Sequence, residues 1–269
     1  MQIPRSFALC SAQDDAGSIM RTILVLVLAL GVSAEAADFD LIIRGAQIVD
    51  GSGSPWYRAD VAIKGDSIAA ISPRIEGSAM REIKAGGRVV SPGFIDLHTH
   101  ARRGLIENPG AENYIRQGVT TIFEGPDGGS PVPLSDFLKR VAEAKTAPNV
   151  AMFIGHGSVR EKVIGNTDRK ATPAELEQMR ELVRQGMRDG AFGLSTGLFY
   201  TPGSFAPIEE VIDLARVAGE SGGIHISHVR NEAAGIVDSV RETIRIGEEG
   251  KLPTQITHHK VMGLTNAGK

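Results

Sequence analysis

The sequence contains little cysteine and few large aromatic side chains. Of its 269 residues, one is cysteine, one is tryptophan and three are tyrosine. A chain with a single cysteine, Cys10, cannot form an internal disulfide and cannot supply the several thiolates of a cysteine metal cluster. Any metal ion must therefore be held by histidine and carboxylate side chains.

An excess of charge of either sign is also absent. The chain has 29 basic and 32 acidic residues, which gives a formal net charge of -3. This balance provides no basic surface for nucleic acid, and no long acidic tract indicates a solvated tail. The composition favours chemistry on a small molecule, and we expect no nucleic-acid partner.

No hydrophobic run reaches the length of a membrane span. The longest, Ile23 to Val32, is shorter than the roughly 20 apolar residues that a spanning helix needs. Arg21 precedes it, and small residues around Ala36 follow it, as in a signal peptide. We therefore predict that residues 1–36 are removed and that the protein is secreted or periplasmic. A membrane anchor is the alternative, and translation beginning at Met20 is a variant of the same prediction.

The pattern of predicted secondary structure changes at Pro92-Gly93. Short strand signals separated by glycines precede this point and predict a small β-sandwich domain over residues 37–91. The strands expected there cover residues 40–44, 47–49, 60–63 and 67–71. From residue 92 onward, strands alternate with amphipathic helices, which is typical of βα units and a parallel sheet.

Six strands are predicted in residues 92–269. They lie near residues 93–98, 118–124, 149–155, 191–195, 223–228 and 253–258. The clearest helix between them has Thr172 as its N-cap, Pro173 at its first position and Gly190 just past its end. We interpret this part as a (β/α)8 TIM-like barrel truncated after about six strands. A complete open sheet of six strands is the alternative.

The first of these strands ends in two histidines. In Phe94-Ile-Asp-Leu-His-Thr-His100, the side chains of His98 and His100 share a face because strand side chains alternate. Two imidazoles at the carboxyl end of a barrel strand can bind one metal ion, and barrel active sites lie at that end. The remaining histidines also lie in or just beyond predicted strands, at positions 156, 225, 228, 258 and 259. With His228 closing the fifth strand and His258 the sixth, the sequence predicts a site of four imidazoles for Zn²⁺, as one or two ions.

Taken together, these features resemble the amidohydrolase superfamily. Its members place His-x-His on the first strand, single histidines on the fifth and sixth, and an aspartate on the eighth, around one or two divalent metals. Finer motifs resemble the N-acyl-D-amino-acid deacylase (D-aminoacylase) branch. These are Gly118-Val-Thr-Thr121, Gly193-Leu-Ser-Thr-Gly-Leu198, His228-Val-Arg-Asn-Glu232 and Ile256-Thr-His-His-Lys260. The resemblance extends from about Phe39 to the end of the chain.

The resemblance implies a hydrolase that cleaves a linear C–N amide bond. The expected reaction converts an N-acyl-D-amino acid into a D-amino acid and a carboxylate, by attack of a metal-bound hydroxide. The general-base aspartate of the eighth strand is expected beyond residue 269, so the chain by itself is expected to be inactive. A cyclic amidase of the dihydropyrimidinase or dihydroorotase type and a non-catalytic homologue are the alternatives.

The ligand that bridges two metals departs from the pattern of the relatives. Many bridge with a carboxylated lysine after the fourth strand, but that strand here ends Leu194-Ser-Thr-Gly197. The D-aminoacylase branch uses a cysteine after the second strand, and Asp127 occupies that position by ungapped counting. Glu124, at the end of the strand itself, is the competing bridge. A simple turn role in Pro126-Asp-Gly-Gly129 is the third interpretation of Asp127.

Substrate contacts follow from the same resemblance. Tyr200 and Lys260 stand where the deacylases place residues that touch the carboxylate of the acyl-amino acid, and an ammonium suits an anionic group. Packing of Tyr200 and surface exposure of Lys260 are the alternatives. His156, at the end of the third strand, is a candidate for lining the same cavity. His225 and His259 are interpreted as structural.

Overall fold

The computed structural model describes residues 37–266. The chain divides between Ser91 and Pro92 into two compact units. The predicted signal peptide lies outside the described residues.

The first unit is a single mixed sheet of five strands rather than two packed layers. Strand β1 (Phe39–Ile48) pairs antiparallel with β2 (Tyr57–Lys64), and β2 pairs antiparallel with β3 (Ser67–Ser72). On its other side, β1 pairs parallel with β4 (Ala79–Lys84) and β5 (Val89–Val90). The sandwich expected from the sequence is therefore one sheet, with a small apolar cluster around Ala46, Val61 and Ala85 and another around Ile42, Ala62 and Ile75.

Strand β1 joins two segments that the sequence indicated as separate strands. Its pairing with β2 shifts register between Ile43 and Ala46, and Gly45 lies there with a φ of +66°. The left-handed conformation at this glycine accommodates the irregularity without ending the strand. Arg44 at the same point donates to Asp60 over 3.0 Å, which ties β1 to β2.

The second unit contains a six-stranded parallel sheet. Its strands are β6 (Phe94–Asp96), β7 (Val119–Glu124), β8 (Asn149–Gly155), β9 (Gly193–Gly197), β10 (Ile224–His228) and β11 (Thr254–Ile256). They lie in the order of the sequence, and each pairs in parallel with the next. All six predicted strands are present, and the curled α/β arrangement confirms the expected barrel type.

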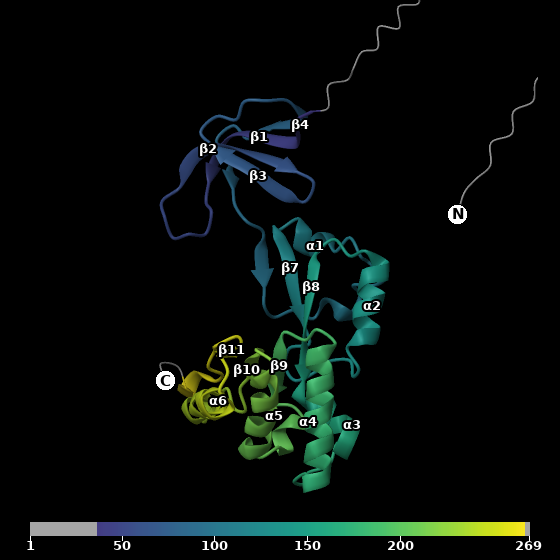
Figure 1. Ribbon diagram of the computed structural model, residues 1–269. Coiled ribbons are helices and arrows are strands. Elements are labelled where there is room, and N and C mark those ends of the chain that lie inside the picture. Colours follow the sequence, from purple (N-terminus) through teal and green to yellow (C-terminus); the bar gives the residue numbers. More distant parts are fainter. Residues whose placement is uncertain (1–36, 267–269) are drawn as a thin grey trace, which may run out of the picture. The chain divides into compact units, whose positions relative to one another are not determined.

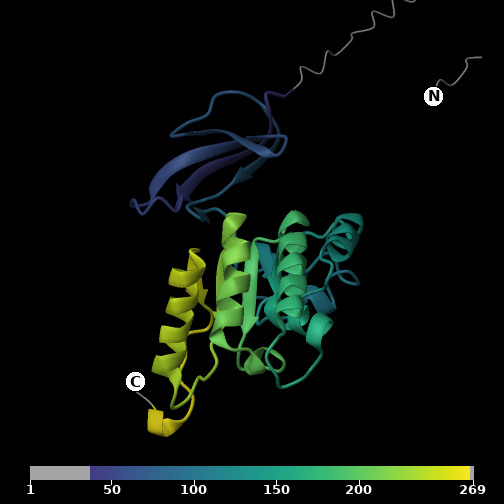
Figure 2. The same cartoon turned by 60° about the horizontal axis from the view of Figure 1, so that its bottom comes forward.

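Helices cover one face of this sheet. They are α1 (Glu112–Ile115), α2 (Ser135–Ala144), α3 (His156–Ile164), α4 (Pro173–Arg188), α5 (Ile208–Glu220) and α6 (Ile236–Gly250). Short 3₁₀ turns span Ala101–Arg103, Gly203–Phe205 and Leu264–Asn266. Helices α4, α5 and α6 stand side by side against the sheet (Figures 1 and 2). Within the described part of the chain, no helix is long and apolar enough to cross a membrane.

The main core lies between this sheet and its helices. Fully buried side chains from the strands, such as Ile154 and Leu194, pack against Val183 of α4 and Leu214 of α5. Helix α4 begins as predicted: Thr172 accepts from the Glu175 amide over 3.3 Å, and Glu175 accepts from the Thr172 amide over 2.9 Å. This reciprocal capping fixes where the chain turns into the helix.

Candidate metal centre

Four histidines and one aspartate meet at the carboxyl ends of the strands. His98 and His100 follow β6, Asp127 follows β7, His228 ends β10, and His258 follows β11. Residues 160 positions apart in the chain thus share one site because parallel strands carry their ends to the same edge. This is the end at which barrel enzymes hold their catalytic groups.

The two carboxylate oxygens of Asp127 face different pairs of histidines. Oδ2 lies 3.3 Å from Nε2 of His98 and 3.3 Å from Nε2 of His100. Oδ1 lies 3.4 Å from Nδ1 of His228 and 4.0 Å from Nε2 of His258. The carboxylate therefore stands between a pair from the first strand and a pair from the fifth and sixth strands.

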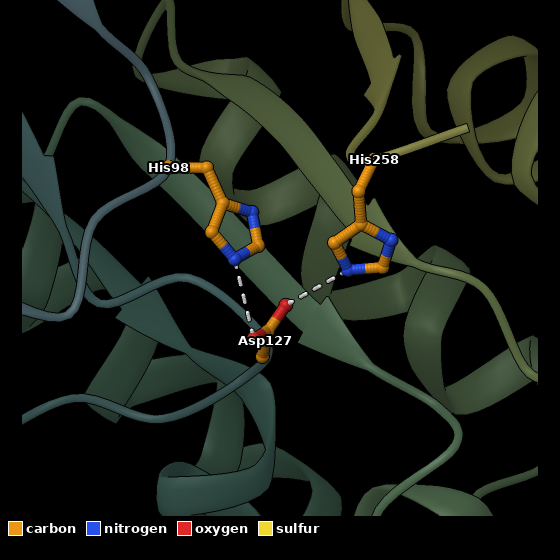
Figure 3. Close-up of side chains that lie close together, drawn as sticks. All are labelled: His98, Asp127 and His258. Atoms are coloured by element: carbon orange, nitrogen blue, oxygen red, sulfur yellow. Dashed lines mark ion pairs between the residues drawn. The ribbon is translucent and has the colours of Figure 1, made fainter. Parts of the chain in front are cut away.

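The imidazole rings lie close together around this carboxylate. The ring centroids of His98 and His258 are 5.2 Å apart, and those of His228 and His258 are 4.3 Å apart. In Figure 3, Asp127 points between the rings of His98 and His258, and the dashed contacts reach both of them. One ligand atom each from His98, Asp127 and His258 falls within 4.8 Å of the others.

Several polar atoms in this cluster are buried without a hydrogen-bond partner among the described residues. They include Asp127 Oδ1, His98 Nδ1 and both ring nitrogens of His228. Burial lowers the pKa of His258, which favours its neutral form. Burial also opposes ionisation of Asp127, but contacts from His228 and His98 outweigh it and hold the pKa of this carboxyl well below its usual value. Imidazole nitrogens and carboxylate oxygens are donors that bind divalent metals, so the donor set fits a divalent cation.

Close backbone packing sets the position of Asp127. Its own φ is +56°, and the next residue, Gly128, lies against the backbone of Gly197 at the end of β9. A Cβ atom at Gly197 would come within 2.1 Å of the Asp127 carbonyl oxygen. Glycines on both sides therefore allow the loop after β7 to reach over β9 and present the carboxylate.

Glu124, the competing bridge, does not face the histidines. Its carboxylate accepts from the Thr99 hydroxyl and, over 2.6 Å, from the Ala101 amide. Only 1% of its surface is exposed, and burial raises the pKa of this carboxyl. Glu124 thus anchors the backbone on both sides of His100 and leaves Asp127 as the carboxylate among the rings.

A second buried carboxylate, Glu232, borders the cluster, and sequence reasoning gave it no role. It lies in the loop after β10 and is 5% exposed. Its Oε1 atom contacts the Lys260 ammonium and lies 3.1 Å from Nδ1 of His258 and 3.8 Å from Nε2 of His228. The position of an acidic residue just beyond His228 was the available signal. Lys260, a predicted substrate ligand, is thereby paired with Glu232.

Tyr200 lies beside the histidines as well. Its ring centroid is 4.7 Å from that of His228, and the side chain is 45% exposed. Burial and the nearby carboxylates raise the pKa of the Tyr200 phenol, which therefore stays a hydrogen-bond donor at neutral pH. The segment after Tyr200 is held by Arg230, which donates to the carbonyls of Ser204 and Ala206. A cavity of about 120 Å³ opens between Asp127 and Tyr200.

His156 lies apart from the group that the sequence indicated. The residue has no exposed surface, and Nε2 lies 3.0 Å from Glu210, which also binds Arg160 over 2.5 Å. A ring with no exposed surface cannot line a cavity open to substrate, so this expectation is corrected: His156 packs beneath the site at the start of α3. His225 is likewise fully buried and contacts Thr196 over 2.9 Å.

Known proteins are similar to this chain in sequence and in fold. The model of the amidohydrolase family matches residues 81–263. The chain belongs to the amidohydrolase family. Within it, the chain is 37% identical to a D-aminoacylase of Alcaligenes xylosoxydans xylosoxydans, over 88% of this chain and 54% of the relative.

Two solved amidohydrolases are similar to this chain in fold and in sequence. A D-aminoacylase described by its binuclear metal centre matches with a TM-score of 0.80 and 38% identity, over 86% of this chain and 53% of that one. An N-acyl-D-glutamate deacylase of Bordetella bronchiseptica, complexed with zinc and a phosphonate inhibitor, matches with a TM-score of 0.82 and 34% identity, over the same shares. The chain spans about half the length of these relatives.

Proposed function

We propose that the protein is a zinc-dependent hydrolase of N-acyl-D-amino acids. The observation that carries this proposal is the placement of Asp127, with one carboxylate oxygen toward each of two histidine pairs. Similarity to D-aminoacylase and to N-acyl-D-glutamate deacylase supports the choice of substrate class.

In this proposal, His98 and His100 would be ligands of one zinc ion, and His228 and His258 would be ligands of a second. Asp127 would be the ligand that they share, in the role that relatives give to a cysteine after the second strand or to a carboxylated lysine after the fourth. A carboxylate is a harder ligand than a thiolate, but both bind zinc alongside imidazoles. When bound, zinc polarises the amide carbonyl and makes water a nucleophile at neutral pH.

The other residues of the site bind and orient the substrate. Lys260 supplies the positive charge that attracts the carboxylate of the acyl-amino acid, and the protonated Tyr200 donates a hydrogen bond to the same group. Because Tyr200 packs on the His228 ring, a substrate held there brings its amide bond next to the cluster. Fixing this geometry before reaction removes part of the entropic barrier. Among the six strands described, none carries the aspartate that relatives place on the eighth.

The test is hydrolysis by the product of the complete open reading frame that contains these residues. The purified protein, loaded with zinc, is assayed on N-acetyl derivatives of D-leucine, D-glutamate and D-aspartate, with the L-isomers as controls. We expect turnover of at least one D-isomer, no turnover of its L-isomer, and loss of activity on chelation of zinc. Hydrolysis of a cyclic amide such as dihydrouracil, with none of the acyl-amino acids cleaved, would contradict the proposal.

We also propose that the protein is exported. The support is the apolar run that ends near residue 32 and the small residues around Ala36. Amino-terminal sequencing of protein from a periplasmic extract tests this, and a mature chain that begins at Met1 or Met20 would argue against cleavage.

A further inference from the structure

Glu232 connects the proposed metal ligands to the proposed substrate ligand through one oxygen atom. The Oε1 atom faces His258 Nδ1, His228 Nε2 and the Lys260 ammonium. The carboxylate is 5% exposed, while the Lys260 side chain is 51% exposed. The carboxylate therefore lies inside the protein, while half of the side chain of its positive partner lies at the surface.

The two histidines turn opposite ring nitrogens toward Asp127. His228 faces Asp127 with Nδ1, and His258 faces it with Nε2. The nitrogen that remains on each ring is the one nearest to Glu232. A histidine binds a metal through one nitrogen only if the other carries the hydrogen, and a carboxylate acceptor stabilises that arrangement.

Lys260 cannot take over this task. Its Nζ atom lies 3.2 Å from His258 Nδ1 and can only donate to it, so Nδ1 can carry a hydrogen toward Glu232 once the ammonium has moved to the substrate. Ligand atoms of Glu232, His228 and His258 also lie within 4.8 Å of one another, so a direct metal contact of Glu232 is the competing role. Oε1 lies 3.1 Å from His258 Nδ1, within reach of a hydrogen bond from that ring, whereas His228 Nε2 lies 3.8 Å away and has no hydrogen-bond partner among the described residues.

We propose that Glu232 is a positioning residue for His258, and that Lys260 exchanges between Glu232 and the substrate carboxylate. This inference rests on the proposed function and deepens it. Glu232 holds the His258 ring in the form that binds zinc. Glu232 also competes with the substrate for the Lys260 ammonium. In the site without substrate, Lys260 is therefore already paired with Glu232.

The decisive variant is Glu232→Gln, which keeps the size of the side chain and removes its charge. Because carboxylates behind metal-binding histidines contribute about ten- to hundredfold to metal affinity, we expect the zinc dissociation constant to rise by that factor. The number of zinc ions per chain at saturation should not change. An unchanged zinc affinity overturns the positioning role, and the loss of one whole zinc ion per chain overturns it in favour of a direct ligand.

The exchange of Lys260 is tested on protein depleted of metal, with N-acetyl-D-leucine as the probe. Releasing the lysine from its ion pair with Glu232 should tighten binding of the probe about threefold in the Glu232→Gln variant. Adding Lys260→Met to this variant should abolish the gain. Equal or weaker binding by Glu232→Gln, or a gain that survives Lys260→Met, overturns the exchange.

Kinetics with zinc at saturation add an independent readout. We expect Glu232→Gln to lower kcat and to lower KM as well, whereas general damage to the fold raises KM. Glu175→Gln is the matched control, because Glu175 pairs with Arg169 over 2.7 Å at the start of α4 and contacts none of the histidines. A wild-type protein that binds no zinc and cleaves no acyl-amino acid refutes the proposed function itself, and active wild type with unaltered Glu232→Gln refutes only this inference.

Discussion

At the scale of single residues, Asp127 shows which part of the site could be predicted from the sequence and which could not. Counting from His100 places an acidic residue where relatives carry a bridging thiolate, but Glu124 is only three positions away. The sequence cannot choose between them because the choice depends on the turn between them. Gly125 lies at a φ of +81°, which redirects the chain so that Glu124 points toward Thr99 and Asp127 toward the rings.

The two carboxylates should respond differently to loss of charge. Asp127→Asn removes the group that faces all four histidines, so we expect zinc bound per chain, measured by inductively coupled plasma mass spectrometry, to fall by at least half. Glu124→Gln keeps an oxygen that can accept from Thr99 and Ala101, so zinc content should stay near that of wild type. The opposite pattern would identify Glu124 as the bridge.

His225 gives a residue-scale prediction for stability. Burial lowers its pKa from 6.5 to about 3, so the folded protein keeps the ring neutral while the unfolded chain takes up a proton. The free energy of unfolding is therefore undiminished above pH 6.5 and falls as the pH drops toward 3, by about 1.4 kcal/mol per pH unit from this group.

His225→Asn removes this titration, so its unfolding free energy should depend less steeply on pH than that of wild type. Urea unfolding of both proteins, depleted of metal, between about pH 4 and pH 7 measures the difference. Parallel pH profiles would show that His225 titrates normally.

At the scale of elements, the strands that could be predicted are those with a clear pattern of apolar residues. Strands β6, β7 and β10 were predictable because each carries apolar residues and ends in an acidic residue or a histidine. Strand β4 was missed because it reads Ala-Met-Arg-Glu-Ile-Lys, without the alternation that indicates a half-buried strand. Its pairing with β1, far away in the sequence, keeps it in the sheet.

The end of β9 offers a test of how one element positions another. Gly197→Ala would place a methyl group against the Asp127 carbonyl, so the loop that carries the carboxylate must shift. We expect a zinc affinity lowered about tenfold or more, since misplaced ligands weaken metal sites. Gly110→Ala is the control because a Cβ there meets nothing within 4 Å. Equal zinc affinity in the two variants would mean that the loop adapts.

At the scale of the whole molecule, the sequence predicted where one unit ends and how the parallel strands succeed each other. Consecutive βα units place each strand beside the previous one, so the order of the strands in the sheet follows their order in the sequence. The single sheet of the first unit was not predictable, because short strands with glycine-rich turns pack as one layer or two depending on distant pairings. Among the described strands, β6 pairs only with β7 and β11 only with β10.

These two edges make self-association of the 269-residue chain a testable property. Ile95 on β6 is 60% exposed, and an exposed apolar edge strand is a site for pairing with another chain. Ile95→Lys should therefore lower the average mass in light scattering at a given concentration. Val237→Lys is the control, because Val237 is 45% exposed on helix α6 and belongs to no strand. An equal effect of both variants would assign the association to general surface hydrophobicity.

The carboxylate of Asp127 has a consequence for chemical durability. A cluster built only from imidazole and carboxylate groups offers nothing for iodoacetamide to alkylate and nothing for peroxide to convert into a sulfenic acid. Soft metal ions such as mercury, which prefer thiolate ligands, also find no preferred ligand in this cluster. If Asp127 holds the position of a bridging thiolate, we expect the site to keep its ligands under conditions that oxidise or alkylate cysteine.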